Sequence, residues 1–195
     1  MPETVAYLAA ATALVLTPGP DTAFVLAQAV GAGRTAGVRA ALGVASGICI
    51  HTIAAVAGLA TLLRAAPTAY DLLTLAGAAY LAYLGVAMLR GDGEFDPETT
   101  PEVAGGFRRG FITNVLNPKV AIFFIAFLPQ FGSGVELLPL GGAYALIAAG
   151  YLGGIALLAG RARVLLASTR ARRWLGRVAG GTTLALAGVA AKETL

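Results

Sequence analysis

The chain has 195 residues, of which 57% are hydrophobic and 12% are charged, and its net charge is +4. A soluble globular domain carries about 25% charged residues, so this composition predicts one membrane domain and leaves little room for anything else. The positive charge does not indicate a nucleic-acid partner, because the arginines stand beside apolar segments, where membrane orientation explains them. A single cysteine, Cys49, excludes an internal disulfide and a CxxC redox pair.

Six apolar segments are long enough to cross a bilayer, which takes roughly 20 residues of α-helix. We predict spans over about residues 4–31, 38–63, 70–89, 108–131, 137–160 and 174–191. The last of them is the weakest, because it is short and rich in glycine. The expected fold is therefore an all-α membrane protein with six transmembrane helices.

The first span is interrupted by Thr17-Pro18-Gly19-Pro20-Asp21. Proline removes a backbone donor and clashes with the preceding turn, so Pro18 and Pro20 are expected to break this helix. In lipid, unwound backbone is tolerated only where it is buried in protein or lines a cavity. Pro20 suits the first position of a new half-helix, and Asp21 then lies in its first turn, where the helix dipole favours a carboxylate. A simple helix-terminal charge is thus the alternative to a binding role for Asp21.

The second span contains His51, the only histidine of the chain. Because the pKa of histidine lies near physiological pH, His51 can act as a proton relay. A neutral histidine that is hydrogen-bonded to a neighbouring helix is an equally good interpretation. With one histidine and one cysteine, the chain offers no metal-ligand cluster, and we expect neither a metal nor a cofactor.

The third span is followed by an acidic connection. Residues 91–106 hold five of the ten acidic residues of the chain, together with Pro97 and Pro101. This composition is typical of a flexible polar linker. We therefore divide the single membrane domain into a first three-helix repeat over 1–90, a linker over 91–106 that lies in the cytoplasm, and a second three-helix repeat over 107–195.

The fourth span is interrupted by Asn117-Pro118-Lys119, so a second helix break is expected at Pro118. Asn117 is a suitable N-cap for the half-helix that follows. A lysine in the first turn opposes the helix dipole, and at the depth of the bilayer it costs about 2.5–3.5 kcal/mol. Lys119 therefore needs an anionic partner. The candidates are Asp21, the only acidic residue deep in a span, and a substrate carboxylate.

The two halves of the chain are similar to each other. Residues 76–87 and 179–190 are identical at seven of twelve positions, although small residues are common in membrane helices and account for part of the match. Pro20 and Pro118 stand at similar offsets in the two halves. Three spans per repeat are an odd number, so the second repeat must be inverted relative to the first. Many secondary transporters share this plan and bind their substrate near the midplane.

The distribution of lysine and arginine predicts the orientation in the membrane. Eleven basic residues fall on the side of the first, third and fifth connections, and two fall on the opposite side. Because basic connections stay in the cytoplasm, we expect the linker inside the cell and both termini outside it.

Four stretches of the sequence carry a resemblance to a known family. They are residues 17–21, 43–58, 75–85 and 107–119, the last of which continues to 128–131. In these stretches the chain resembles the LysE/RhtB family of bacterial amino-acid exporters. The resemblance implies an inner-membrane protein, not an enzyme, that exports amino acids or their derivatives from the cytoplasm and is coupled to the proton-motive force. Its partners would be the substrate, protons and the lipid bilayer, and a homodimer is left open.

We predict that the two half-helix N-termini meet near the midplane, since exposed helix amides bind anions. The predicted substrate site consists of Thr17, Gly19, Asp21, Asn114, Asn117 and Lys119, and the candidates for a proton relay are Asp21 and His51. One alternative is a cation or metal exporter on a related six-helix scaffold, which would require several intramembrane carboxylates or histidines. The other is a membrane subunit that does not itself transport.

Overall fold

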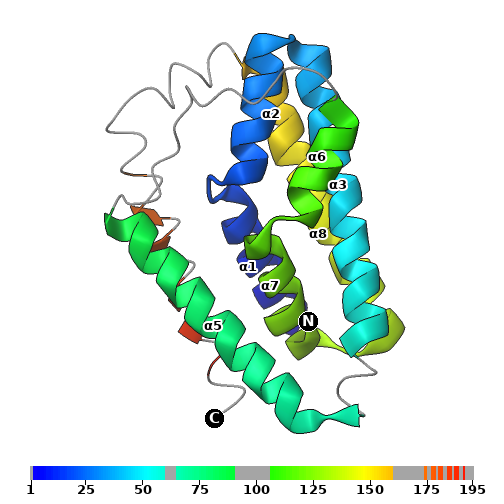
Figure 1. Cartoon of the computed structure of the whole chain (residues 1–195), viewed down its shortest axis with the longest axis vertical. Helices are drawn as coiled ribbons and strands as arrows, with labels where there is room; N and C mark the ends of the chain where they lie inside the picture. The colour runs from blue at the N-terminus through cyan, green and yellow to red at the C-terminus, as the bar shows by residue number, and fades with distance from the viewer. Residues whose placement is uncertain are drawn as a thin grey trace.

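The computed structural model describes residues 2–59, 65–90 and 106–159, together with ten positions between 174 and 191. Within these residues every regular element is a helix (Figure 1). The predicted all-α class is therefore confirmed, and it is consistent with a membrane protein. Almost all of the predicted linker and eight of the eighteen residues of the sixth predicted span lie outside the described residues.

The first predicted span consists of two helices with a bend between them. α1 (Pro2–Leu16) and α2 (Pro20–Gly31) are inclined to each other by 51°. α3 (Arg34–Ala54) follows and continues into a π-helical turn, η1 (Ala55–Leu59). The third predicted span corresponds to α5 (Pro67–Arg90).

The fourth predicted span is broken in the same way. α6 (Gly106–Val115) is followed by α7 (Pro118–Ala126), which leads into a short 3₁₀ helix, η2 (Leu128–Phe131), and the bend measures 50°. A second 3₁₀ helix, η3 (Gly134–Glu136), precedes α8 (Leu137–Leu157). The sequence thus predicted both helix breaks correctly.

By length and composition, two stretches of the described residues suit membrane crossing, Arg34–Ala57 and Gly134–Leu157. The number rises to four if each bent pair is counted as one span. The described part of the chain therefore supports a protein with several spans.

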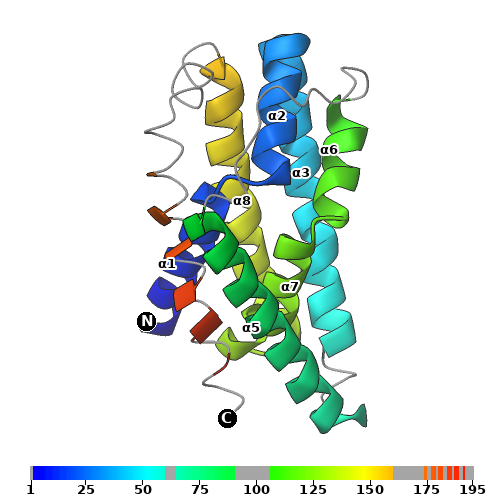
Figure 2. The same cartoon turned by 60° about the vertical axis from the view of Figure 1, so that its left-hand side comes forward.

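α3 packs against α2, α6 and α8 (Figure 2). Its close approach to α6 depends on glycine. A Cβ atom at Gly43 would collide with the backbone of Phe107, and one at Gly110 would collide with the carbonyl group of Ala40. α5 leans away from this bundle and packs against α7 (Figure 1).

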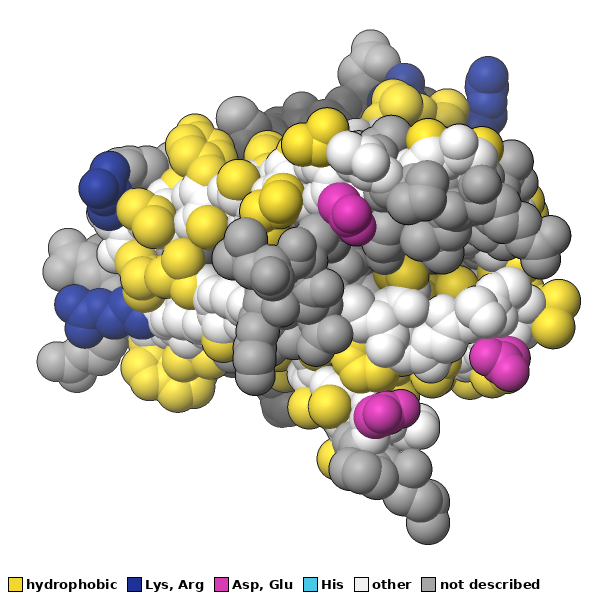
Figure 3. Space-filling view, turned by 90° about the horizontal axis from the view of Figure 1, so that it is seen from below, with side chains coloured by type: hydrophobic (Ala, Val, Ile, Leu, Met, Phe, Trp, Pro, Cys, Tyr) yellow, Lys and Arg dark blue, Asp and Glu magenta, His cyan; other side chains and the backbone are white. Residues whose placement is uncertain are grey.

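The outer surface of the bundle is largely apolar. Val5 on α1, Leu116 between α6 and α7, and Leu146 on α8 expose 67%, 74% and 76% of their surface. Hydrophobic side chains also spread over the end of the molecule seen in Figure 3, with charged side chains scattered among them. Extended apolar surface of this kind marks contact with a membrane or with other proteins.

Candidate functional site

The breaks in the two bent helix pairs meet in the interior of the bundle, and each is formed by proline, which cannot donate the next helical hydrogen bond. α2 begins after Gly19, which has extended backbone and provides no side-chain cap. α7 begins after Asn117, whose side-chain oxygen accepts a hydrogen bond from the Lys119 amide at 3.1 Å. The predicted N-cap is therefore present at the second break.

Asp21 extends from the first turn of α2 into the other break. Its Oδ2 accepts hydrogen bonds from Nδ2 of Asn114 at 2.9 Å and from Nδ2 of Asn117 at 3.0 Å. Its Oδ1 is buried and accepts no hydrogen bond from the described residues. Burial of a carboxylate is costly unless its oxygens are paired. The second oxygen of Asp21 is therefore available to a ligand or to water.

Lys119 extends in the opposite sense, from the first turn of α7 into the break between α1 and α2. Its Nζ donates hydrogen bonds to the carbonyl oxygens of Thr17 at 3.1 Å and Leu14 at 3.3 Å, and only 8% of the residue is exposed. These carbonyl groups belong to the C-terminal end of α1, which carries negative partial charge. A cation that is unfavourable at the start of its own helix is thus stabilised by the end of another.

Within the described residues Asp21 and Lys119 do not form a direct ion pair, but both line one cavity. Among the described residues Nζ of Lys119 contacts carbonyl oxygens rather than a carboxylate, and Asp21, one of its two predicted anionic partners, faces the same cavity. Gly19 leaves room for this arrangement, because a Cβ atom at Gly19 would lie 3.1 Å from Nζ of Lys119.

The cavity has a volume of about 20 Å³, which accommodates about one water molecule. Its polar lining consists of Thr17, Asp21, Thr22 and Lys119. Its apolar lining consists of Leu14, Val15, Val44, Ile48, Val120, Tyr144, Ala148 and Leu152. Two opposite charges therefore face a small, mostly aliphatic space.

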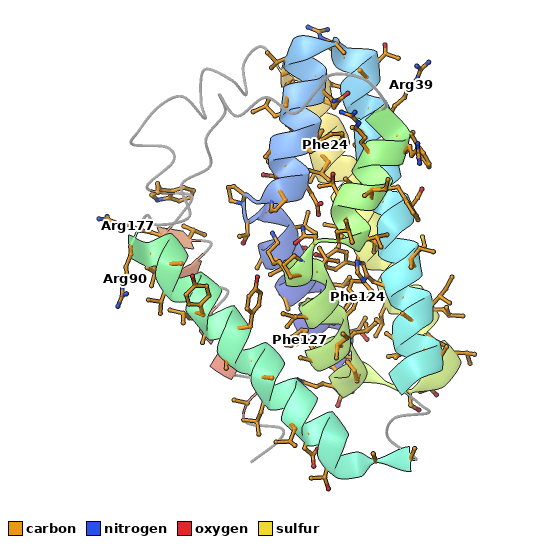
Figure 4. The ribbon with its side chains drawn as sticks, in the orientation of Figure 1. Phe24, Arg39, Arg90, Phe124, Phe127 and Arg177 are labelled. Atoms are coloured by element: carbon orange, nitrogen blue, oxygen red, sulfur yellow. The ribbon has the colours of Figure 1, made fainter. Side chains whose placement is uncertain are left out.

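Aromatic rings support the wall of the cavity that α7 and α8 provide. The ring of Tyr144 lies 5.4 Å from that of Phe123 and 5.2 Å from that of Phe124, measured between centroids. Phe124 and Phe127 lie along α7 in the interior of the bundle, whereas Arg39 points away from it (Figure 4). Packed aromatic side chains of this size stabilise the position of α7 at the break.

His51 does not line the cavity, but it contacts a residue that holds Asp21. Its Nε2 lies 3.1 Å from the carbonyl oxygen of Asn114, and its ring centroid lies 5.9 Å from that of Phe124. The role of His51 as a proton relay remains a prediction.

The structure brings the predicted substrate residues together. Thr17, Asp21 and Lys119 line the cavity, and the other three contact them: Asn114 and Asn117 bind Asp21, and Gly19 lies against Lys119. Their role in binding remains a prediction. Sequence reasoning missed Thr22, which follows Asp21 directly, and the aliphatic residues of α3 and α8. The latter carry no signal of their own, because every residue of an apolar span resembles its neighbours.

Curated relatives of this chain include amino-acid efflux proteins. The leucine efflux protein of Salmonella typhimurium is 40% identical over 129 residues, which cover 64% of this chain and 61% of that protein. The leucine efflux protein of Klebsiella pneumoniae is 35% identical over 130 residues, which cover 64% and 61%. An uncharacterized membrane protein of Pseudomonas aeruginosa is 39% identical over 133 residues, which cover 64% and 62%. The chain thus matches less than two thirds of the length of these relatives.

No solved structure matches the chain. The LysE type translocator family matches residues 12–194, which is nearly the whole sequence and includes both helix breaks and the cavity between them. The chain therefore belongs to the LysE type translocator family, whose members are transporters and not enzymes.

Proposed function

We propose that this protein is a secondary-active transporter of the bacterial inner membrane that exports amino acids or their derivatives. Family membership and the relatives named leucine efflux protein support this function. The observation that carries it is the shared cavity of Asp21 and Lys119, in which Asp21 Oδ1 has no partner among the described residues. An amino acid is a zwitterion, and it presents one group of each charge at a fixed spacing.

In the proposed complex, the substrate ammonium binds Oδ1 of Asp21. Two of the three hydrogens of the Lys119 ammonium are used by carbonyl groups, and the third is left for the substrate carboxylate. The amides at the start of α2 add to this anion site, since helix N-termini bind anions. The substrate side chain then lies against Val44, Ile48 and Leu152, which favours an aliphatic residue such as leucine.

The substrate does not fit into a space for one water molecule. The conformation therefore represents a closed state, and transport requires opening toward each side in turn. We propose that residues 1–90 and 107–195 are inverted three-helix repeats that rock against each other. The nearly equal bends of 51° and 50° support this symmetry.

Basic side chains at one end of the bundle support an orientation with both termini outside the cell. The starts of α3 and α6 lie at the same end of the bundle (Figure 1), and Arg34, Arg39 and Arg108, which stand near these starts, are exposed. In the proposed orientation this end faces the cytoplasm, as basic connections do in bacterial membrane proteins. A reporter enzyme fused after Leu195 should then be active only in the periplasm.

Proton coupling follows if Asp21 binds either a proton or the substrate ammonium, but not both. Intramembrane carboxylates serve as proton carriers in pumps and transporters. Protonation from outside would displace the substrate ammonium, and release of the proton inside would restore the site for the next substrate.

Purified protein in liposomes tests this function. Vesicles preloaded with radiolabelled leucine should lose the label faster when a pH gradient is imposed, and valine or isoleucine should compete more strongly than lysine or glutamate. Empty liposomes give the background leak. Efflux at the background rate for every amino acid tested, with and without the gradient, would contradict amino-acid export.

A further inference from the structure

A proline inside a helix leaves one carbonyl group, four residues earlier, without its usual amide donor. Here these carbonyl groups belong to Leu14, four residues before Pro18, and to Asn114, four residues before Pro118. Each oxygen keeps a hydrogen bond from the amide three residues later, at 3.3 Å for Leu14 and 2.9 Å for Asn114. The two breaks thus share the same kind of defect, although Pro18 lies within its break and Pro118 opens α7.

In both breaks a side chain from another helix replaces the missing donor. Nζ of Lys119 donates to the Leu14 oxygen at 3.3 Å. Nε2 of His51 lies 3.1 Å from the Asn114 oxygen. A carbonyl oxygen can only accept a hydrogen bond, so Nε2 of His51 must carry the hydrogen. His51 and Lys119 are therefore equivalent in this respect, although they come from different helices.

We propose that His51 is a positioning residue. It fixes the carbonyl group of Asn114 and, through it, holds the Asn114 amide against Oδ2 of Asp21, a contact of 2.9 Å. Its effect on transport rests on the proposed function, whereas its effect on the α6–α7 break does not.

A second contact on the same face of α3 supports this assignment. Gly47, one turn before His51, packs against the Asn114 side chain, and a Cβ atom there would lie 2.7 Å from Oδ1 of Asn114. Asn114 itself is fully buried. α3 thus contacts Asn114 through a hydrogen bond to the Asn114 backbone and through close packing on the Asn114 side chain. These two contacts restrict the position of Asn114.

The observed contact does not provide a proton path. The group between His51 and Asp21 is a backbone carbonyl followed by a carboxamide, and neither takes up a proton at physiological pH. Donation of a hydrogen bond, which does not require His51 to titrate, is the chemistry that this geometry uses.

Two substitutions separate donation from titration. In His51→Gln the amide nitrogen is as many bonds from the backbone as Nε2, so it can reach the Asn114 oxygen. In His51→Asn the nitrogen is one bond closer to the backbone and falls short. Neither side chain titrates in the physiological range, so a proton relay would be lost equally in both variants.

Hydrogen exchange of the full-length protein in detergent, followed by mass spectrometry, measures the local stability of the backbone at the α6–α7 break. His51→Asn should raise the exchange rate in peptides covering 110–121 by roughly five- to tenfold, whereas His51→Gln should stay close to wild type. Peptides covering 13–22 should not change in either variant. Lys119→Gln is the matched control, since it should loosen 13–22, where Leu14 and Thr17 lose their donor.

Leucine efflux driven by a pH gradient provides the second measurement. His51→Gln should keep most of the wild-type rate and the wild-type pH profile, and His51→Asn should raise the KM several-fold. The proposal is overturned if both variants exchange alike in 110–121. It is also overturned if His51→Gln protects that segment but loses pH-driven efflux, which would assign proton transfer to His51. If wild-type protein transports no amino acid, the proposed function fails, and the exchange data still decide the role of His51.

Discussion

The two broken helices have nearly the same shape and opposite chemistry. Their bends measure 51° and 50°, and in each a charged residue follows the proline that opens the second half-helix. At the first break that residue is Asp21, whose charge agrees with the dipole of α2. At the second it is Lys119, whose charge opposes the dipole of α7.

This difference explains why the two side chains cross, which means that each extends from its own break into the other one. Asp21 is held by the amides of Asn114 and Asn117 in the second break, and Lys119 by the carbonyl groups of Leu14 and Thr17 in the first. Each break therefore supplies the groups that the charge of the other requires. The arrangement holds the charges in one cavity without a direct ion pair, as the proposed zwitterion site requires.

The largest expected effect is that of Asp21→Asn on transport. The amide oxygen of the new side chain can still accept hydrogen bonds from Asn114 and Asn117, so the protein should fold and reach the membrane. The charge that we propose to bind the substrate ammonium is lost. Since hydrogen bonds to charged groups contribute about 1.5–3 kcal/mol, leucine efflux should fall roughly 10- to 100-fold. Efflux from liposomes, normalised to folded protein, gives the comparison, and a wild-type rate would remove Asp21 from the site.

Lys119→Gln should differ from Asp21→Asn by lowering stability as well as transport. The shorter side chain cannot reach the carbonyl groups of Leu14 and Thr17, so both lose the donor that Lys119 provides, and Leu14 keeps only the Thr17 amide. An unsatisfied buried acceptor costs about 1–3 kcal/mol. Thermal unfolding in detergent should show a lower midpoint for Lys119→Gln than for Asp21→Asn. Equal midpoints would mean that the crossed contacts do not differ in their structural role.

Gly47→Ala should disturb the second break through packing alone. The added Cβ would lie 2.7 Å from Oδ1 of Asn114, so Asn114 or α3 must shift. Overpacking of this kind costs roughly 1–3 kcal/mol. Gly150→Ala on α8 is the control, because nothing lies within 4 Å of its added Cβ. That variant should be neutral or slightly stabilising, since alanine has the higher helix propensity. Thermal unfolding should show a lower midpoint for Gly47→Ala than for Gly150→Ala. Equal midpoints would contradict the close packing at Asn114.

The residues that the sequence predicted share one property, which is that each breaks a rule for a smooth apolar helix. Pro18, Pro20 and Pro118 remove donors, and Asp21 and Lys119 bring charge into lipid depth, so the breaks and the charges could be assigned in advance. The all-α class followed from the length of the apolar segments.

The crossed pairing could not be assigned from the sequence. A pair of opposite charges suggests an ion pair, and the sequence has no signal for which backbone carbonyl groups lie opposite Lys119. The same limit applies to His51. The sequence favoured a relay and interhelical packing equally, because the position of the Asn114 carbonyl depends on how closely α3 and α6 approach.

The smallest expected effect is the difference between two substitutions at a helix cap, where the two breaks also differ. α7 is capped by the Asn117 side chain, whereas α2 starts at Gly19 without a side-chain cap. Asn117→Gly makes the second break resemble the first. Glycine in place of an asparagine N-cap costs only a few tenths of a kcal/mol. The lost hydrogen bond to the Asp21 carboxylate adds about 1.5–3 kcal/mol, and it is lost equally in Asn117→Gly and Asn117→Ala. Asn117→Ala should cost more, because alanine is a poor cap. Replacing an asparagine N-cap by alanine typically lowers the free energy of unfolding by about 1 kcal/mol. Urea or thermal unfolding of the two variants should therefore rank wild type above Asn117→Gly and Asn117→Ala last. If the glycine variant were the less stable of the two, the flexibility of the break rather than its cap would control the start of α7.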